Sequence, residues 1–215
     1  MAAQERGPYG GRPDKRQAIV LAARKVFGRE GYSRAGVDVI AAEAGVSKRT
    51  IYNHFGDKEQ LFQSVALEGA REVTAAIKQI MERHLRKVVD IEQDLIDFTL
   101  DRIAAVTAFP DHFALVRTIE AEAGRIPPPI LKAWVEEGPQ SGHHRLAPYL
   151  RRIGEQGLLE IDDADRAASH LTLLTITDVN QQTFYGLLPL PQPELTEIAT
   201  SGVRAFMRLY GPAAN

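Results

Sequence analysis

A cluster of hydrogen-bond donors at residues 48–54 is the part of the sequence with the clearest chemical potential. The cluster holds cations, hydroxyls and an amide: Lys48, Arg49, Thr50, Tyr52, Asn53 and His54. Ile51 and Phe55 are four residues apart, so they line one helix face and leave the donors towards solvent. Such donors hydrogen-bond phosphate oxygens and base edges, and the open amides of a helix start bind phosphate. The cluster therefore predicts contact with a nucleic acid, with a solvated surface turn as the alternative.

Patterns of catalytic and metal-binding residues are missing from the sequence. The adjacent His143 and His144 lack the i, i+4 spacing that directs two imidazoles to one metal ion. There is no HExxH, GxGxxG, P-loop or GxSxG motif, and there is no cysteine nucleophile. We therefore expect no cofactor, no metal site and no enzyme, with a helical enzyme kept as an alternative to be tested.

The charge is divided unevenly along the chain. Residues 1–64 hold 11 Lys and Arg against 7 Asp and Glu, a balance of +4. Residues 65–215 hold 15 against 21, a balance of −6, which gives the overall net charge of −2. A basic N-terminal part on an acidic remainder favours a polyanionic partner for the first part only. Chance unevenness in a neutral enzyme is the alternative.

The composition is that of an ordinary globular protein. Apolar residues make up 44% of the 215 residues and charged residues 25%. The absence of cysteine excludes disulfides and fits a cytoplasmic setting. No stretch approaches the ~20 apolar residues that a membrane span needs, and no signal peptide is visible. We expect a soluble cytoplasmic protein that does not enter a membrane.

The elements that would position the donor cluster are short helices separated by glycines. Apolar residues at i, i+3, i+4, i+7 and i+8 from Ile19 to Phe27 predict a helix that ends near Gly31. Residues 37–44 form a second helix, and Gly45 provides the sharp turn after it. Ser47 caps a third helix that ends at Gly56, and a long fourth helix follows. The second and third helices have the dimensions of a helix-turn-helix.

The remainder of the chain also has helical periodicity. We expect helices over residues 88–108, 111–123, about 130–154, 164–186 and 195–210, with proline breaks at residues 125–129 and 187–193. Gly138, Pro139 and Pro148 predict a kink or interruption near residues 138–142. No strand pattern competes, so the predicted fold class is all-α.

Residues 16–65 resemble the DNA-binding domain of the TetR (tetracycline-repressor-like) family. The resemblance rests on the order of an Ala-Ala…Phe…Gly-Tyr helix, Ile-Ala…Ala-Gly-Val-Ser, Tyr-x-His-Phe and Lys-Glu-x-Leu-Phe. It implies a three-helix DNA-binding domain followed by a helical ligand-binding and dimerisation domain, about nine helices in total. The implied domains are a flexible arm at 1–13, a helix-turn-helix domain at 14–60 and a regulatory domain at 61–215.

The resemblance implies roles for individual residues of the donor cluster. Arg49 would read a guanine edge, and Thr50 would touch a base or a thymine methyl. Tyr52, His54 and Lys58 would contact phosphates, although partial packing is an alternative for the first two. The implied DNA-binding residues are Lys48, Arg49, Thr50, Tyr52, Asn53, His54 and Lys58.

Two features near this domain qualify the resemblance. Family members usually carry Thr or Ser before the second helix, where this chain has Ala35-Gly36. Gly36 can cap the helix, but the hydroxyl contact to phosphate is lost, and Ser33 or Arg34 would have to substitute. Arg6 and Arg12 in the arm could enter a minor groove, or the arm could be a disordered tail.

The resemblance also implies that the protein binds double-stranded operator DNA as a homodimer. Two recognition helices one helical turn apart, ~34 Å, would read a palindrome. The small Ala199 and Gly202 in the last apolar stripe would let a partner helix approach closely. The expected dimer residues are Leu171, Leu174, Ala199, Gly202, Val203 and Phe206. Packing of these stripes within one subunit is the alternative.

The middle helices hold most of the large aromatic residues, where similar proteins enclose an apolar effector pocket. The expected ligand-binding residues are Phe98, Phe109, Phe113, Arg117 and Trp134. Ordinary core packing is the alternative for each aromatic residue. The prediction is a repressor released from its operator by a small, largely apolar effector of unknown identity. The alternatives are activation and a ligand-independent DNA-binding or interaction protein.

Overall fold

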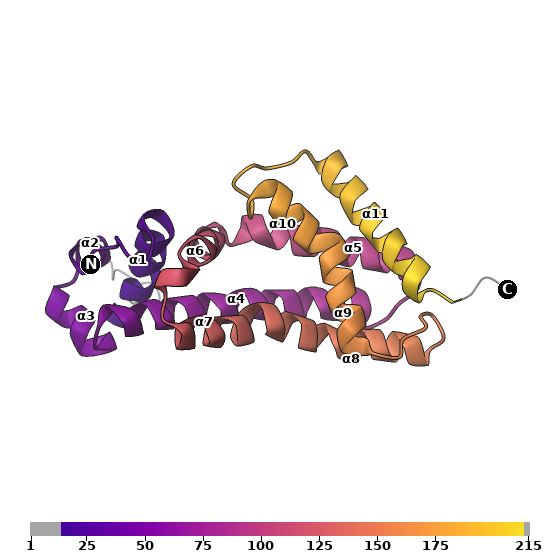
Figure 1. Ribbon diagram of the computed structural model, residues 1–215, viewed down its shortest axis with the longest axis horizontal. Coiled ribbons are helices and arrows are strands. Elements are labelled where there is room, and N and C mark those ends of the chain that lie inside the picture. The colour runs from indigo at the N-terminus through magenta and orange to yellow at the C-terminus, as the bar shows by residue number, and fades with distance from the viewer. Residues whose placement is uncertain (1–13, 213–215) are drawn as a thin grey trace, which may run out of the picture.

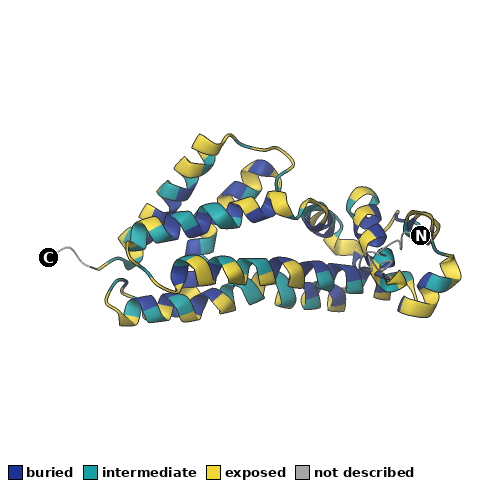
Figure 2. Ribbon diagram, turned by 180° about the vertical axis from the view of Figure 1, so that it is seen from behind, coloured by how far each residue is buried: buried dark blue, intermediate teal, exposed yellow. Residues whose placement is uncertain are grey.

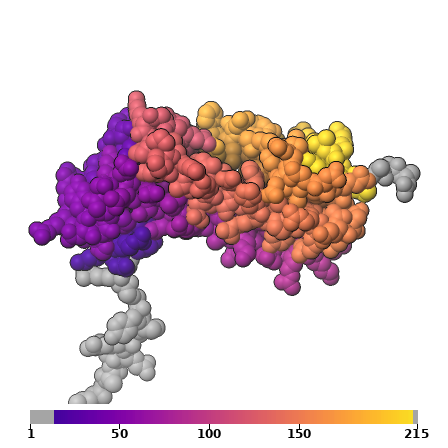
Figure 3. Space-filling view, turned by 60° about the horizontal axis from the view of Figure 1, so that its bottom comes forward, coloured from indigo at the N-terminus to yellow at the C-terminus, as the bar shows by residue number. Residues whose placement is uncertain are grey.

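The computed structural model describes residues 14–212, and every regular element among them is helical. The predicted arm at residues 1–13, with Arg6 and Arg12, lies outside the described residues. Figures 1 and 3 show an elongated molecule with the N-terminal helices at one end. Counting each π-helical segment with the helices it joins, the described residues form nine continuous helical runs and one short 3₁₀ turn. The predicted all-α fold class is confirmed.

Three short helices form the head of the molecule: α1 (Lys15–Glu30), α2 (Val37–Ala44) and α3 (Lys48–Phe55). Gly45 ends α2 in the left-handed conformation, with φ 64° and ψ 34°, as the sharp turn requires. The Ser47 side chain then accepts a hydrogen bond from the Thr50 amide and starts α3. The head is thus built by local signals at the ends of its helices.

Helix α4 (Lys58–Leu85) connects the head to the rest of the molecule. Its 28 residues span about 42 Å at 1.5 Å per residue, and Figure 1 shows it along the length of the molecule. Leu61, Phe62 and Val65 on its first turns are buried in the same core as α1 and α3. The predicted boundary between residues 60 and 61 therefore falls inside a helix that completes the core of the head.

The body consists of the remaining helices. They are α5 (Ile91–Ala108), α6 (Pro110–Ala121), a 3₁₀ turn (Ala123–Arg125), α7 (Pro128–Val135), the π-helix η2 (Glu136–Gln140), α8 (Ser141–Glu155), α9 (Ala164–Thr172), the π-helix η3 (Leu173–Thr177), α10 (Asp178–Thr183) and α11 (Gln192–Tyr210). Figure 2 shows buried residues along the faces of these helices that point towards one another. None of the helices among residues 14–212 is both long and apolar enough for a bilayer crossing.

The prediction near residues 138–142 was a kink or an interruption, and the structure shows no interruption but a change from α- to π-helical geometry at η2. The chain remains helical from α7 through η2 into α8, although Pro139 lies within the run. Proline has no amide to donate and crowds the preceding turn, and the wider π turn accommodates it. A second π turn, η3, joins α9 to α10 in the same way.

Candidate nucleic-acid interface and internal cavity

Helix α3 presents its polar residues at the surface of the head. Ile51 and Phe55 are buried, while Lys48, Arg49, Tyr52, Asn53 and His54 are exposed. Ile51 packs in the core that α1, α2 and α4 share, so the outward face of α3 is fixed by its inward one. The structure therefore places five of the seven predicted contact residues on one solvent-facing surface.

The polar side chains of α3 differ in whether they form hydrogen bonds or ion pairs with other groups of the protein. The Lys48 ammonium lies 2.6 Å from the Asp38 carboxylate, which raises the pKa of Lys48. The half-buried Thr50 hydroxyl lies 2.9 Å from the Ser47 hydroxyl. Among the described residues, no hydrogen-bond or ion-pair partner contacts the Arg49 guanidinium. Arg49 is therefore the cation of α3 that is most available to a ligand.

Lys58, at the start of α4, sits deeper than the predicted phosphate contact suggests. Its ammonium donates to the Ser33 carbonyl at 3.1 Å and lies 5.4 Å from the centre of the Tyr32 ring. Burial lowers the pKa of Lys58, with the charge of Glu122 acting in the opposite direction. Two of its three N–H groups do not take part in this bond. Lys58 therefore stabilises the head and still has donors for a ligand at its surface.

Helix α6 packs directly against α1 of the head. A Cβ built at Gly28 would lie 3.1 Å from the Cβ of Ala114, so the glycine permits this close approach. The Thr118 hydroxyl lies 3.2 Å from the Gly28 carbonyl, to which it can donate. Glu122 accepts hydrogen bonds from the Ser33 amide and hydroxyl at 2.9 and 2.8 Å, and these bonds lower the pKa of Glu122. A movement of α6 would therefore be transmitted to α1 and the head.

The other face of α6 lines an internal cavity of about 260 Å³, to which α4, α5, α7, η2, α8, α9, η3 and α10 also contribute residues. Apolar side chains such as Val73, Val106 and Ile176 form most of the wall. The volume lies slightly below the ~300–1,000 Å³ that is usual for small-molecule sites. The cavity therefore suits a compact ligand.

The cavity contains some of the predicted ligand-binding residues and not others. Phe113 and Trp134 line it. Phe98, Phe109 and Arg117 do not belong to its wall. Phe98 is fully buried in the neighbouring core, Phe109 ends α5, and Arg117 donates to the Tyr185 carbonyl at 2.9 Å. The aromatic content of the sequence indicated the right helices but could not show which helix face meets the cavity.

Among the residues with unpartnered polar atoms in the cavity wall, sequence reasoning predicted Trp134 and missed Arg102, His112 and Asn180. Four polar atoms of this wall are buried without a hydrogen-bond partner: Arg102 Nε, His112 Nδ1, Trp134 Nε1 and Asn180 Oδ1. Buried polar atoms without partners cost folding free energy, and their concentration in a cavity indicates a ligand-binding site. Arg102 lies four residues before Val106, so the sequence predicts that both lie on one face of α5. The sequence around them does not show that this face lines a cavity.

His112 links the cavity to the head. Burial lowers its pKa to about 4, and the charge of Arg24 acts in the same direction, whereas Glu72 opposes it. Arg24 of α1 forms two hydrogen bonds with Glu72 of α4, at 2.6 and 2.9 Å. A cavity residue, a head arginine and a connecting-helix carboxylate therefore form one electrostatic group.

Tyr185 closes part of the cavity in an uncommon backbone conformation. Phe184 and Tyr185 have φ values of 47° and 51°, in the left-handed region that residues other than glycine seldom adopt. The Tyr185 ring stacks on Phe113 with centroids 6.2 Å apart, and its hydroxyl donates to Glu120. Burial raises the pKa of Tyr185, and the hydrogen bond to Glu120 raises it further. These contacts fasten the end of α10 to α6.

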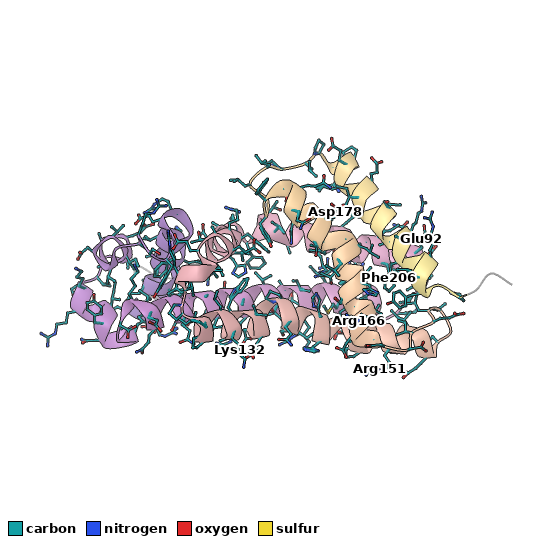
Figure 4. All side chains as sticks on the ribbon, in the orientation of Figure 1. Glu92, Lys132, Arg151, Arg166, Asp178 and Phe206 are labelled. Carbon is teal, nitrogen blue, oxygen red and sulfur yellow. The ribbon has the colours of Figure 1, made fainter. Side chains whose placement is uncertain are left out.

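Most of the residues predicted to contact a partner are buried within one subunit, as in the alternative of packing inside a single chain. Leu171, Ala199, Val203 and Phe206 have no exposed surface, and Phe206 points from α11 into the body (Figure 4). A Cβ at Gly202 would lie 2.0 Å from the Leu174 carbonyl oxygen. The small residues do allow close helix packing, but the helix that approaches is η3 of the same chain.

Comparison with protein families matches both parts of this architecture. The family "Bacterial regulatory proteins, tetR family" matches residues 19–65, from α1 to the first turns of α4. The family "AefR-like transcriptional repressor, C-terminal domain" matches residues 93–212, which is more than half of the chain.

Individual relatives point the same way. The transcriptional activator FasR of Mycolicibacterium smegmatis is 35% identical over 115 residues, 50% of this chain and 48% of that protein. The transcriptional repressor AcnR of Corynebacterium efficiens is 37% identical over 66 residues, 31% of this chain and 35% of that protein. The aligned region thus spans about half or less of the length of these relatives.

Solved structures extend the likeness over nearly the whole chain. A TetR-family transcriptional regulator from Mesorhizobium loti has a TM-score of 0.82 and 32% identity, covering 92% of this chain and 96% of that one. The flavonoid-responsive regulator FrrA has a TM-score of 0.70 and 26% identity, covering 93% and 98%. The chain therefore belongs to the TetR family of bacterial regulatory proteins, a family of transcription regulators and not of enzymes.

Proposed function

We propose that this protein is a repressor that binds palindromic operator DNA as a homodimer and is released by a compact effector. The observation that carries the proposal is the exposed face of α3, with an unengaged Arg49 beside Tyr52, Asn53 and His54. A guanidinium free of protein partners can form two hydrogen bonds with a guanine edge in the major groove. One short helix reads only a few base pairs, so specificity calls for two copies.

The dimer surface that we propose differs from the one predicted from sequence. Large apolar side chains are exposed along η3, the end of α10 and the loop that follows: Leu173, Phe184, Leu187 and Leu188. Burial of this surface against a second copy would remove apolar area from water. The buried stripe of α11 then supports the surface from behind and does not form it.

We propose that the effector occupies the internal cavity and acts through α6. His112, Phe113 and Glu120 on one side of this helix line the cavity. Ala114, Thr118 and Glu122 on the other side contact α1 and the loop after it. A ligand that binds better to one position of α6 would shift the population of head positions, and with it the distance between the two α3 helices.

Selection of bound sequences from random double-stranded DNA tests the DNA-binding part. The expected result is a palindrome with half-sites one helical turn apart, ~34 Å. Light scattering of the free protein and of its DNA complex should give two chains in each case. A monomer in both states, or enrichment of no sequence, would overturn the proposal.

A reporter gene downstream of the selected sequence tests the direction of regulation. We expect lower expression when the protein is present. FasR is named an activator and AcnR a repressor, so relatives of both kinds match part of this chain. Higher expression would overturn repression and leave the DNA-binding assignment in place.

A further inference from the structure

The cavity contains a cation without a counter-charge. Arg102 is only partly accessible, and desolvation lowers its pKa to about 10. Its Nε has no hydrogen-bond partner among the described residues, where its one hydrogen bond is a long one of 3.4 Å from Nη1 to the Thr172 hydroxyl. The guanidinium lies 5.4 Å from the centre of the Phe98 ring. No carboxylate of the described residues forms an ion pair with it.

Arg24 of α1 is a buried arginine that does have a counter-charge. Arg24 is held by two hydrogen bonds to both carboxylate oxygens of Glu72. A guanidinium withdrawn from water without a counter-charge destabilises the folded state, so it is seldom present without a function. Within residues 14–212, Arg102 therefore lacks the carboxylate that would complete an ion pair.

The carboxylate that lines the cavity does not supply this half. Glu120 accepts the hydrogen bond of the Tyr185 hydroxyl, at the part of the wall formed by α6 and the end of α10. His143 also lines the cavity, and burial lowers its pKa, with the charge of Arg102 as the next cause. A neutral His143 adds a hydrogen-bonding group beside Arg102 without adding a second positive charge.

Most of the remaining wall is apolar, although the neutral polar residues Thr74, His112, Thr172, Thr177 and Asn180 also line it. Val106 lies one helical turn from Arg102 on α5, and Phe113, Trp134 and Ile176 complete the surroundings. A single cation in an apolar cavity is neutralised by a single negative charge, whereas a dianion would leave one charge buried and unpaired. Guanidinium pairs with carboxylate through two parallel hydrogen bonds, which suits a group that has free N–H donors.

We propose that the effector is a compact organic monocarboxylate, with its carboxylate bound by Arg102 and its apolar part against Val106, Phe113 and Trp134. This inference rests on the proposed function, since it specifies the ligand of the same cavity. It makes Arg102 the residue that selects an acid over the neutral analogue of the same shape.

Matched probes test the proposal on the intact protein. Binding is measured by calorimetry and thermal unfolding for decanoate and 2-naphthoate, and for the corresponding neutral amides, decanamide and 2-naphthamide. At least one acid should bind the wild-type protein about tenfold or more tightly than its amide, the size expected of a charge-assisted hydrogen bond. Equal binding of acid and amide would overturn the inference, while the proposal that an effector binds in the cavity would stand. No binding by any probe would contradict both, while leaving the DNA selection result unaffected.

Substitution of Arg102 assigns the preference to one residue. Arg102→Met should abolish the difference between acid and amide and should raise the unfolding temperature of the free protein, because an unpaired buried charge is removed. Arg102→Lys should keep a reduced preference for the acid. Arg151→Met removes an exposed arginine of α8 (Figure 4) and should change neither property. An undiminished preference in Arg102→Met would refute the assignment, and Arg102→Lys supplies the comparison if the methionine variant does not fold.

Discussion

Arg49 on α3 and Arg102 on α5 carry the same guanidinium in opposite surroundings. Arg49 is exposed on the head and remains hydrated, so leaving it without a protein partner costs little. Arg102 lies in an apolar cavity, where desolvation lowers its pKa to about 10. Both are unpaired, but only the second is unpaired at the expense of stability.

The comparison extends to the two regions around these residues. The polar groups of α3 face water and are available to DNA without any rearrangement. Four polar atoms of the cavity wall, among them Arg102 Nε and His112 Nδ1, are shielded from water, so a ligand that bonds to them gains more from each hydrogen bond than it would in water. Changes on α3 should therefore alter DNA binding with little effect on stability, whereas changes in the cavity should alter stability itself.

The largest expected effect concerns His112 in the cavity, for which the exposed His54 on α3 provides the control variant. The pKa of His112 is lowered to about 4 in the folded protein, against about 6.5 in an unfolded chain. The unfolded state therefore binds the proton first as pH falls. The neutral His112 makes its full contribution to the unfolding free energy above pH 6.5, and this contribution is lost as the pH falls towards 4. The difference of about 2.5 pKa units corresponds to about 3 kcal/mol.

Urea unfolding at several pH values between 7 and 4 measures this contribution. His112→Asn should show a smaller loss of unfolding free energy on acidification than the wild-type protein. His54→Asn, which changes an exposed histidine, should follow the wild-type curve. Parallel curves for wild type and His112→Asn would mean that the cavity does not desolvate this imidazole.

The next effect is on specific DNA binding. Arg49→Ala should weaken binding to the selected operator by roughly 1–3 kcal/mol and relax the preference at one base position. Its unfolding temperature should stay that of the wild type, because no intramolecular contact is lost. Fluorescence anisotropy with operator variants measures the affinity, and the exposed Arg208→Ala on α11 is the control. Wild-type affinity in Arg49→Ala would remove α3 from the base-reading role.

A smaller effect is expected at the start of α3. Ser47→Ala removes the side chain that accepts a hydrogen bond from the Thr50 amide. The loss of such a cap costs about 1 kcal/mol of unfolding free energy. Ser201→Ala, at an exposed position within α11, should cost much less. Chemical denaturation distinguishes the two variants, and equal values would show that the cap does not stabilise the head.

The smallest effect concerns a phosphate contact at the base of the head. Lys58→Ala should weaken binding to all DNA sequences alike and reduce the slope of log affinity against log salt by about one unit. Lys132→Ala, on the exposed face of α7 (Figure 4), should leave the slope unchanged. An unchanged slope in Lys58→Ala would mean that this ammonium remains on the Ser33 carbonyl when DNA is bound.

Local sequence signals predicted the structure of the head. The turn at Gly45 and the cap at Ser47 lie within a few residues of the helix ends that they determine. The spacing of Ile51 and Phe55 decided which side of α3 faces outward, because both periodicity and burial act within one turn. The same reasoning identified the helical class of the body.

The arrangement of the body could not be read in the same way. The apolar stripe through Ala199, Val203 and Phe206 has the same pattern whether it packs on its own subunit or on a partner. The helix through Pro139 continues because a π turn absorbs the proline, and the residue alone predicts a break.

The sequence by itself determined the helical class, the helix-turn-helix and the outward face of α3, because caps, turns and periodicity act over a few residues. Only the tertiary structure decided which apolar stripe is internal, where α6 meets α1, and that Arg102 faces a cavity without a counter-ion. Those features arise between helices that are distant in the sequence. The type of a residue and its near neighbours do not show whether a distant segment will bury it.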